Sequence, residues 1–121
     1  MNDFEKVLHN IETDLTESEK TELKKTILAG WENIKRSFKN NDITINEAEV
    51  EKLYKLSIKA QAFQDDALEK WCREGIKAWI LEGEQVKRLK SINTFEKQAC
   101  IVGKVLINIV LAVLTRTDGG L

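Results

Sequence analysis

Cys72 and His9 are the first residues to consider for chemistry, because a thiol beside an imidazole can act as nucleophile and base. His9 is the single histidine of the chain. No HExxH, ExxH or Cys/His spacing surrounds it, so a metal site there needs remote carboxylates to converge. Arg73 favours a thiolate at Cys72, but Cys72 recurs with Ile76 and Ile80 at helical spacing, which favours core packing. We therefore expect no enzyme activity, no metal and no cofactor.

The segment over residues 38–49 carries oxygen-bearing side chains at alternate positions, as a calcium-binding loop does. Asp42 and Glu49 fall at suitable places in such a loop. The first position, however, is Phe38 rather than an aspartate, and Ile43 stands where the loop needs a glycine. We interpret the segment as a connection between helices. A glycine-rich phosphate loop and a GxSxG elbow are also absent from the sequence.

The most specific pattern alternates two tryptophans with two glycines every four residues: Trp71, Gly75, Trp79 and Gly83. On a helix this spacing forms one ridge, which can pack into a groove of another helix. Each glycine costs about 1 kcal/mol relative to alanine in a helix interior, so two in register indicate a close approach. One interpretation is that a helix of the same fold fills the gaps, through Ala99 and Gly103. The other is a slot for a partner helix or a flat apolar ligand, with the tryptophans as anchors.

The segment from Ala99 to Leu114 is the only strongly apolar run, and Asn108 is the one polar residue of its core. A run without a polar side is expected to be buried on all sides, by the chain's own helices, a second copy, a partner protein or lipid. A buried amide without a hydrogen-bond partner costs about 1 to 3 kcal/mol, and in helical oligomers such an amide often meets its counterpart. We predict that the core or an oligomer interface contains Gly103, Val105, Asn108 and Leu111. A partner for Asn108 within the monomer is an equal alternative.

The apolar spacing predicts that helices position these residues, and the absence of proline agrees with long helices. A first amphipathic helix is predicted from Phe4 to Leu15. A capping box of Thr16 and Glu19 predicts a second, which ends near Lys39 before a turn at residues 40–42. Its expected buried stripe consists of Leu23, Ile27, Trp31, Ile34 and Phe38.

Thr44 and Glu47 repeat the capping-box spacing and predict a third helix. Its near-heptad stripe is Val50, Leu53, Leu56, Ala60, Phe63 and Ala67. An unbroken helix over residues 47–90 would be atypically long for a globular domain, so we expect a break near Asp65 and Asp66, with Asp66 as a candidate cap. The next apolar face is Leu68, Cys72, Ile76, Ile80 and Leu89.

The last helix is predicted to begin at Asn93, with Glu96 in its third position, and to contain the apolar run. A strand over residues 105–114 is the alternative, because valine and isoleucine favour sheets, but it would have to pair with a second copy. Residues 117–121 are expected to form a frayed tail.

The composition predicts one globular domain over residues 1–121, because 42% of the residues are apolar and 32% charged. A net charge of -1 argues against general nucleic-acid binding. Two cysteines without a CxxC pair, and an N-terminus without a secretion signal, indicate a cytoplasmic protein. As a helix the apolar run spans roughly 24 Å, short of the ~30 Å hydrocarbon core, so we expect no transmembrane span. Peripheral membrane contact stays open.

Together these patterns predict an all-α bundle of four to five helices, with the apolar C-terminal helix central or at an oligomer interface. The function they favour is a small protein-binding module that self-associates, as a homodimer or other homo-oligomer, and acts as a regulator, adaptor or inhibitor. The alternative is a helical protein that binds an apolar ligand, such as a fatty acid or lipid, or a membrane surface.

Overall fold

The computed structural model describes residues 9, 11–80 and 85–119, and within these residues it contains helices and no strand. The long helices are α2 (Glu17–Asn40), α3 (Glu47–Phe63), α4 (Asp66–Trp79) and α5 (Gln85–Gly119). Residues 11–14 form a further short helical segment before α2. The predicted all-α bundle is confirmed, and the apolar run is a helix rather than a strand.

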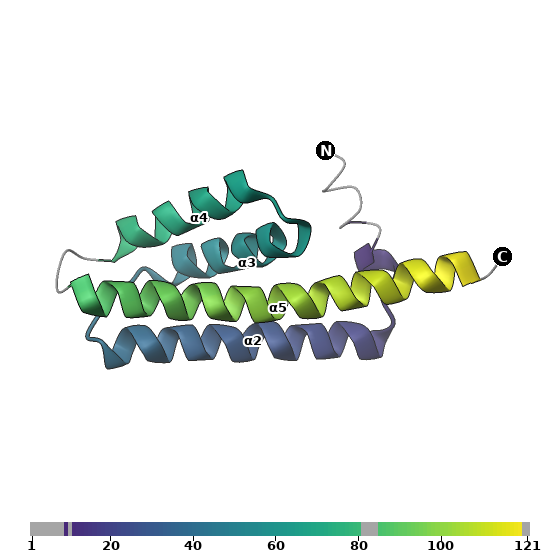
Figure 1. Cartoon of the computed structure of the whole chain (residues 1–121). Helices are drawn as coiled ribbons and strands as arrows, with labels where there is room; N and C mark the ends of the chain where they lie inside the picture. Colours follow the sequence, from purple (N-terminus) through teal and green to yellow (C-terminus); the bar gives the residue numbers. More distant parts are fainter. Residues whose placement is uncertain (1–8, 10, 81–84, 120–121) are drawn as a thin grey trace.

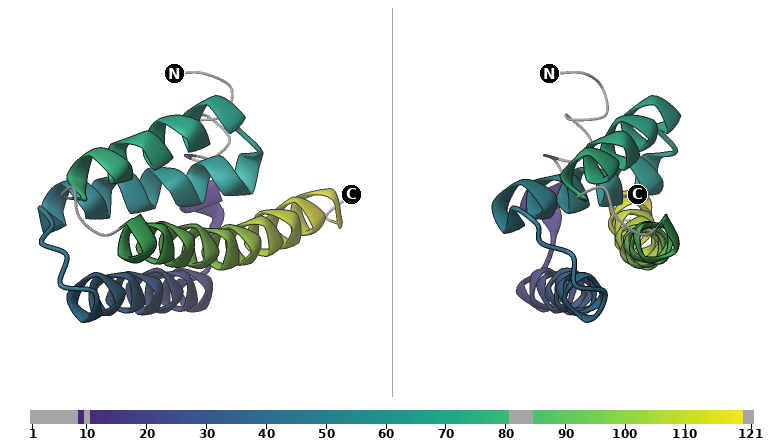
Figure 2. Two further views of the ribbon diagram at one scale, coloured as in Figure 1. Left: turned by 60° about the vertical axis from the view of Figure 1, so that its left-hand side comes forward. Right: turned by 90° about the vertical axis from the view of Figure 1, so that its left-hand side faces the viewer.

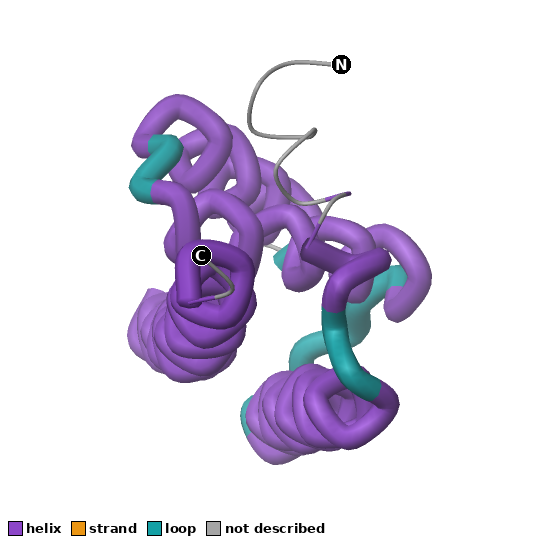
Figure 3. Tube along the Cα trace, turned by 90° about the vertical axis from the view of Figure 1, so that its right-hand side faces the viewer, coloured by secondary structure: helices purple, strands orange, loops and turns teal. Residues whose placement is uncertain are grey.

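The four long helices form two layers. α5 lies antiparallel to α2, and the α3/α4 hairpin packs across this pair (Figure 1). Figure 2 shows α3 and α4 side by side above α5, and the view along the helices in Figure 3 places α3 over the space between α2 and α5. The C-terminal helix is therefore central, because it contacts each of the other three long helices.

Local capping explains where α2 begins and ends. The Thr16 hydroxyl accepts a hydrogen bond from the Glu19 amide, and the Glu19 carboxylate accepts one from the Thr16 amide, which confirms the predicted capping box. The helix ends at Asn40, one residue beyond the prediction, and Asp42 with φ 56° reverses the chain at the predicted turn. The stripe is confirmed as well, since Trp31, Ile34 and Phe38 are buried.

The caps of α3 and α4 differ from the predicted ones by one or two residues. Asn46, not Thr44, caps α3 and accepts from the Glu49 amide. The shift occurs because Ile43 and Ile45 lie in a non-helical segment and pack against the core before the helix begins. The expected break near residue 65 is confirmed: Gln64 is left-handed with φ 56°, and Asp65, one residue before the predicted Asp66, caps α4.

The predicted start of the last helix was wrong. α5 already begins at Gln85, and Asn93 is an exposed residue in its interior. No proline or glycine interrupts residues 85–93, and the buried Ser91 and Ile92 keep the helix in phase with the core, so a polar pattern at Asn93 does not end it. Leu89, predicted on the face of the preceding helix, lies on α5 and is 55% exposed.

The main core lies between α2, α3 and α5, and Ile76 of α4 and the adjoining Ile80 also belong to it. Tyr54 is its largest fully buried side chain, stacked near Trp31 with ring centroids 6.0 Å apart and edge-on to Phe95 at the same distance. The Tyr54 hydroxyl donates to the Ile27 carbonyl at 3.1 Å. A side chain at Gly30 would overlap that hydroxyl, so Gly30 lets the ring bridge α3 and α2.

A second, smaller core lies at the other end of α5. Its buried members are Ile11, Leu15 and Val113, with Leu23, Ile109 and Val110 packed around them. Much of the helix predicted from Phe4 to Leu15 lies outside the described residues, but residues 11–14 are helical. α5 extends to Gly119, into the segment expected to be a frayed tail, and residues 120 and 121 lie outside the described part.

Candidate functional site

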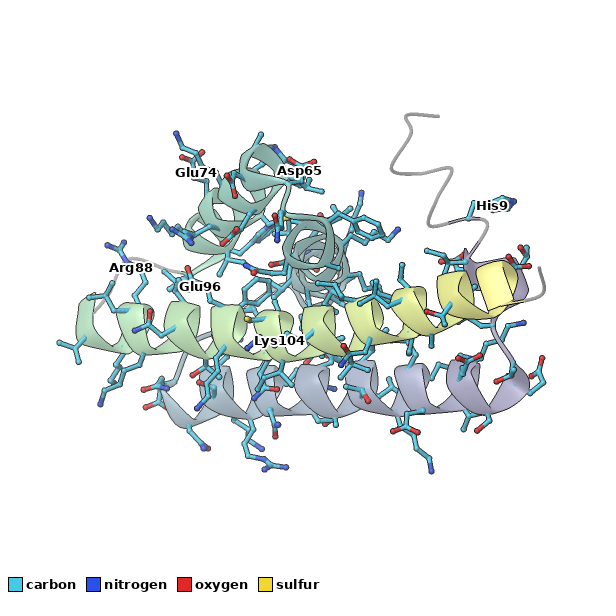
Figure 4. The ribbon with its side chains drawn as sticks, turned by 45° about the vertical axis from the view of Figure 1, so that its right-hand side comes forward. His9, Asp65, Glu74, Arg88, Glu96 and Lys104 are labelled. Atoms are coloured by element: carbon cyan, nitrogen blue, oxygen red, sulfur yellow. The ribbon has the colours of Figure 1, made fainter. Side chains whose placement is uncertain are left out.

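The two candidate groups for catalysis do not form a pair. Cys72 is fully buried in α4, and this burial, with the nearby carboxylates of Asp65 and Glu69, raises the pKa of its thiol to about 11. A protonated, enclosed thiol is a poor nucleophile at neutral pH. His9 is exposed at the end of the molecule away from α4 (Figure 4).

The described residues also contain no group of three or more His, Cys, Asp or Glu placed to hold a metal ion. Asp42 and Glu49, from the turn that superficially matches a calcium loop, are both exposed. Among the helices described, none is long and apolar enough to cross a bilayer.

The tryptophan and glycine ridge runs along the side of α4 that faces α3. The gap at Gly75 is already occupied, because a Cβ built there would lie 2.9 Å from Leu53 Cδ1. A helix of the same fold therefore fills this gap, but it is α3 and not the Ala99 and Gly103 part of α5. Gly83 lies outside the described residues. Trp71 and Trp79 remain 57% and 38% exposed, respectively, so the indoles are still accessible.

Trp71 lies one turn before the contact between α4 and α3 at Gly75. The contact between Leu53 and Gly75 marks the line where the two helices touch, and Tyr54 and Cys72 lie on its core side. Trp71 is exposed on the opposite side, whereas Leu56 of α3 is half-buried, and Phe63 in the last turn of α3 is half-buried and packs against the main core.

The apolar run forms the second exposed apolar surface. Its inner side is buried through Ala99, Val102 and Leu106, but Ile101 is 44% and Leu111 56% exposed on its outer side. The chain's own helices therefore cover only one side of the run, and burial of the other side by a second copy, a partner protein or lipid stays a prediction. The reason is geometric: α2 and α3 cover only one side of a helix that has apolar residues all round.

The four residues predicted for a core or an interface differ in how far they are buried. Gly103 is buried against α3, where a Cβ would lie 3.0 Å from Gln61 Cβ and 3.3 Å from the Ala62 amide nitrogen. Val105 is half-buried, whereas Asn108 and Leu111 are exposed. Asn108 therefore has no place in the monomer core.

Electrostatic contacts fix α4 on α5. Arg73 Nε lies 2.7 Å from Glu96 Oε1 on α5, and Arg73 Nη2 lies 3.2 Å from Glu69 Oε1 on its own helix. The sequence pattern gave no signal for this pairing, because Arg73 and Glu96 are distant in sequence. The small enclosed space beside it, lined by Ser57 and Phe95 among others, has a volume of about 10 Å³, room for one water at most.

Comparison of the chain with protein-family models, with curated proteins and with solved structures finds no match in any of the three. The interpretation of the two exposed surfaces accordingly depends on their own chemistry.

Proposed function

We propose that this chain is a small protein-binding module that self-associates through the outer face of α5 and acts as a regulator, adaptor or inhibitor of other proteins. The observation that carries the proposal is the exposure of Ile101 and Leu111 on the side of α5 that faces away from the core. Exposed apolar side chains in register along one helix are typical of an interaction site.

The outer face has the spacing of a helical interface. Its residues recur at alternating steps of three and four: Ile101, Lys104, Asn108, Leu111 and Thr115. Steps of three and four are those of a heptad seam between paired helices, in which Ile101 and Leu111 would be the apolar members, and a single asparagine in such a seam sets register at some cost in stability. The exposed side-chain amide of Asn108 is thus available to a second copy of the chain. That copy would supply the hydrogen-bond partner that the monomer core does not supply.

An antiparallel pair suits this seam better than a parallel one. In a parallel pair the two Lys104 side chains would face one another, and like charges in an interface repel. In an antiparallel pair centred on Asn108, the two lysines are about 12 Å apart along the axis, beyond the ~8 Å Debye length at physiological ionic strength. The two amides then meet at the twofold axis, as an isologous dimer requires.

The size of the seam predicts a weak dimer. From Ile101 to Thr115 it extends about 21 Å along one helix, so the area buried falls at the low end of specific interfaces. We therefore expect a dimer that forms in the micromolar range and dissociates on dilution.

Sedimentation velocity over a range of protein concentrations tests this proposal. We expect the wild-type chain to dimerise, Leu111→Glu to stay monomeric, and Asn108→Leu to change the dissociation constant or the number of copies. Leu28→Glu is the matched control, because Leu28 is also 56% exposed but belongs to α2.

Three results would contradict self-association: a monomer at high micromolar concentration, equal effects of the two glutamate variants, or no effect of Asn108→Leu. A monomer that co-sediments with phospholipid vesicles only while Leu111 is intact would favour the membrane-surface alternative instead.

A further inference from the structure

We propose that α4 is a movable cover of the bundle: it rolls away from α5 about its contact with α3, and the ion pair between Arg73 and Glu96 latches it closed. The proposal goes beyond self-association, because it does not involve the outer face of α5. It rests on three observations: the small share of α4 in the main core, the unequal contacts of α4 with its two neighbours, and the position of the ion pair.

The main core can stay packed without α4. Among its buried members in the described part of the chain, α4 and its C-cap supply Ile76 and Ile80, whereas α2, α3 and α5 supply the others. Figure 2 shows α4 on the side of α3 that is away from α2. Elements that contribute few buried contacts open more readily than the core they lie on. Release of α4 from α5 therefore leaves the packing among α2, α3 and α5 in place.

The contacts of α4 with α3 and with α5 differ in closeness. Gly75 places the backbone of α4 against α3, so close that a Cβ would lie 2.9 Å from Leu53 Cδ1. On the side of α5, a space of about 10 Å³ remains, lined by Ile76 of α4 and Phe95 of α5 among others. Side chains beside unfilled space lose dispersion contacts. Because Gly75 has no side chain to interlock with α3, we place the pivot at this contact and the opening on the side of α5.

The ion pair lies across the side that opens. Arg73 Nε is 2.7 Å from Glu96 Oε1 on α5, and Arg73 Nη2 is 3.2 Å from Glu69 Oε1 on α4, so Glu69 helps to orient the guanidinium toward Glu96. The side chains of Arg73 and Glu96 are 44% and 34% exposed, so dissolved salt screens their attraction. A part-exposed pair of this kind changes an equilibrium by about two- to fivefold.

The closed form is the major one, because it buries Cys72 and Ile76 of α4. Opening uncovers these two side chains together with Ile92 and Phe95 of α5, which are buried in the closed form. The two forms thus differ in exposed apolar surface. Any ligand that binds one form more tightly than the other would shift the balance between them.

The thiol of Cys72 reports the opening, because it is fully buried in the closed form. Cys72 and Cys100 are the two cysteines of the chain, so Cys100→Ser in the full-length protein leaves one thiol to measure. Its reaction with a chromogenic aromatic disulfide is followed at urea concentrations below the unfolding transition. We expect a rate that depends only weakly on urea, because opening exposes far less surface than unfolding does.

Substitutions of the two charged partners test the latch in the Cys100→Ser background. Glu96→Gln and Arg73→Gln should each raise the labelling rate about two- to fivefold, and the double variant should not exceed the larger single effect, because all three remove the same pair. Added sodium chloride should accelerate labelling of the parent protein and have little effect on Glu96→Gln. Glu51→Gln is the matched control, because it removes an exposed ion pair within α3 and should leave the rate unchanged.

Hydrogen exchange of the wild-type chain gives a second measurement that needs no cysteine variant. The amides of α4 should exchange through a smaller opening free energy than those in the centres of α3 and α5. Leu111→Glu should leave both exchange and labelling unchanged, which separates this result from self-association.

Three outcomes would overturn the proposal. The first is labelling of Cys72 with the same urea dependence as global unfolding, together with equal protection of α4 and α3 in hydrogen exchange. The second is an equal effect of Glu96→Gln and Glu51→Gln on the rate. The third is full additivity of Arg73→Gln and Glu96→Gln, which would show that the two residues act on the fold separately and not as one pair.

Discussion

The central part of α5 and its C-terminal part have similarly apolar sequences but different surroundings. Over residues 91–106 the helix is packed against α2 and α3, and Phe95, Ala99 and Val102 are almost completely buried. Over residues 107–115 the described residues that lie against it are those at the start of α2 and around Ile11 and Leu15 (Figure 1). The same helix is thus packed against two long helices along its central part and against a smaller core along its C-terminal part.

Because of this difference, contributions to the stability of the monomer and to its association should come from different residues of α5. The central part can contribute to folding through many neighbours, whereas the C-terminal part leaves apolar area for a second chain. A substitution in the central part should therefore lower the free energy of unfolding, and one on the outer face should change association with little effect on the monomer.

The largest expected effect is that of Phe95→Ala. We predict a loss of about 3–5 kcal/mol in the free energy of unfolding, because a fully buried aromatic ring is replaced by a cavity. Val113→Ala, in the small terminal core, should cost only about 1–2 kcal/mol at ~0.8 kcal/mol per buried CH₂. Urea denaturation at one protein concentration measures both. Equal losses would show that the two parts of α5 are equally enclosed.

Alanine substitutions at Gly103 and Gly75 test an effect of intermediate size on stability, and the second serves as a control for the first. A methyl group at Gly103 meets the backbone of α3 at Ala62 and Ile58, which cannot move aside, so Gly103→Ala should destabilise by about 1–3 kcal/mol. At Gly75 it meets only the end of the Leu53 side chain, and the gain in helix propensity of about 1 kcal/mol offsets the displacement. Gly75→Ala should therefore be nearly neutral in thermal unfolding. A greater loss at Gly75 would contradict this assignment.

Tyr54→Phe should have a smaller effect. It removes the hydrogen bond to the Ile27 carbonyl while keeping the ring contacts, and the expected loss is about 0.5–1.5 kcal/mol. Unfolding in urea measures it, with Lys55→Ala on the exposed side of α3 as a control. A loss above that of Phe95→Ala would mean that the hydroxyl, not the ring, holds α2 on α3.

The smallest expected effect is a loss of stability that appears only in alkaline solution. Burial raises the pKa of Tyr54 from 10.0 to about 12 and that of Cys72 from 9.0 to about 11. Their neutral forms are favoured in the folded chain, so this part of the stability is complete below pH 9 and is lost as the pH rises through 11 and 12. Tyr54 is the only tyrosine, so absorbance of tyrosinate reports it alone. A midpoint near 10 in the folded protein would contradict its burial.

The sequence predicted the helices better than their contacts. The stripe of α2, its capping box and the break near Asp65 followed from spacing and cap chemistry, which are local. The start of α5 was missed because a polar residue such as Asn93 is compatible with both a cap and an exposed helical position. Tyr54 was not singled out as a core residue, because its burial depends on the bare backbone of Gly30 in another helix.

The candidate sites show the same division. The spacing of Trp71, Gly75 and Trp79 correctly indicated a close helix contact, yet only the tertiary structure shows that Leu53 makes it and that Trp71 stays outside.

By itself, the sequence determined that the chain is helical, where α2 and the hairpin turn lie, and that its last helix contains the most apolar run of the chain. The tertiary structure decided which side of that helix the other helices cover and which side stays open. The reason is that helix formation depends on hydrogen bonds and side chains within a few residues, whereas burial depends on how many neighbours a chain of this length can place around each helix.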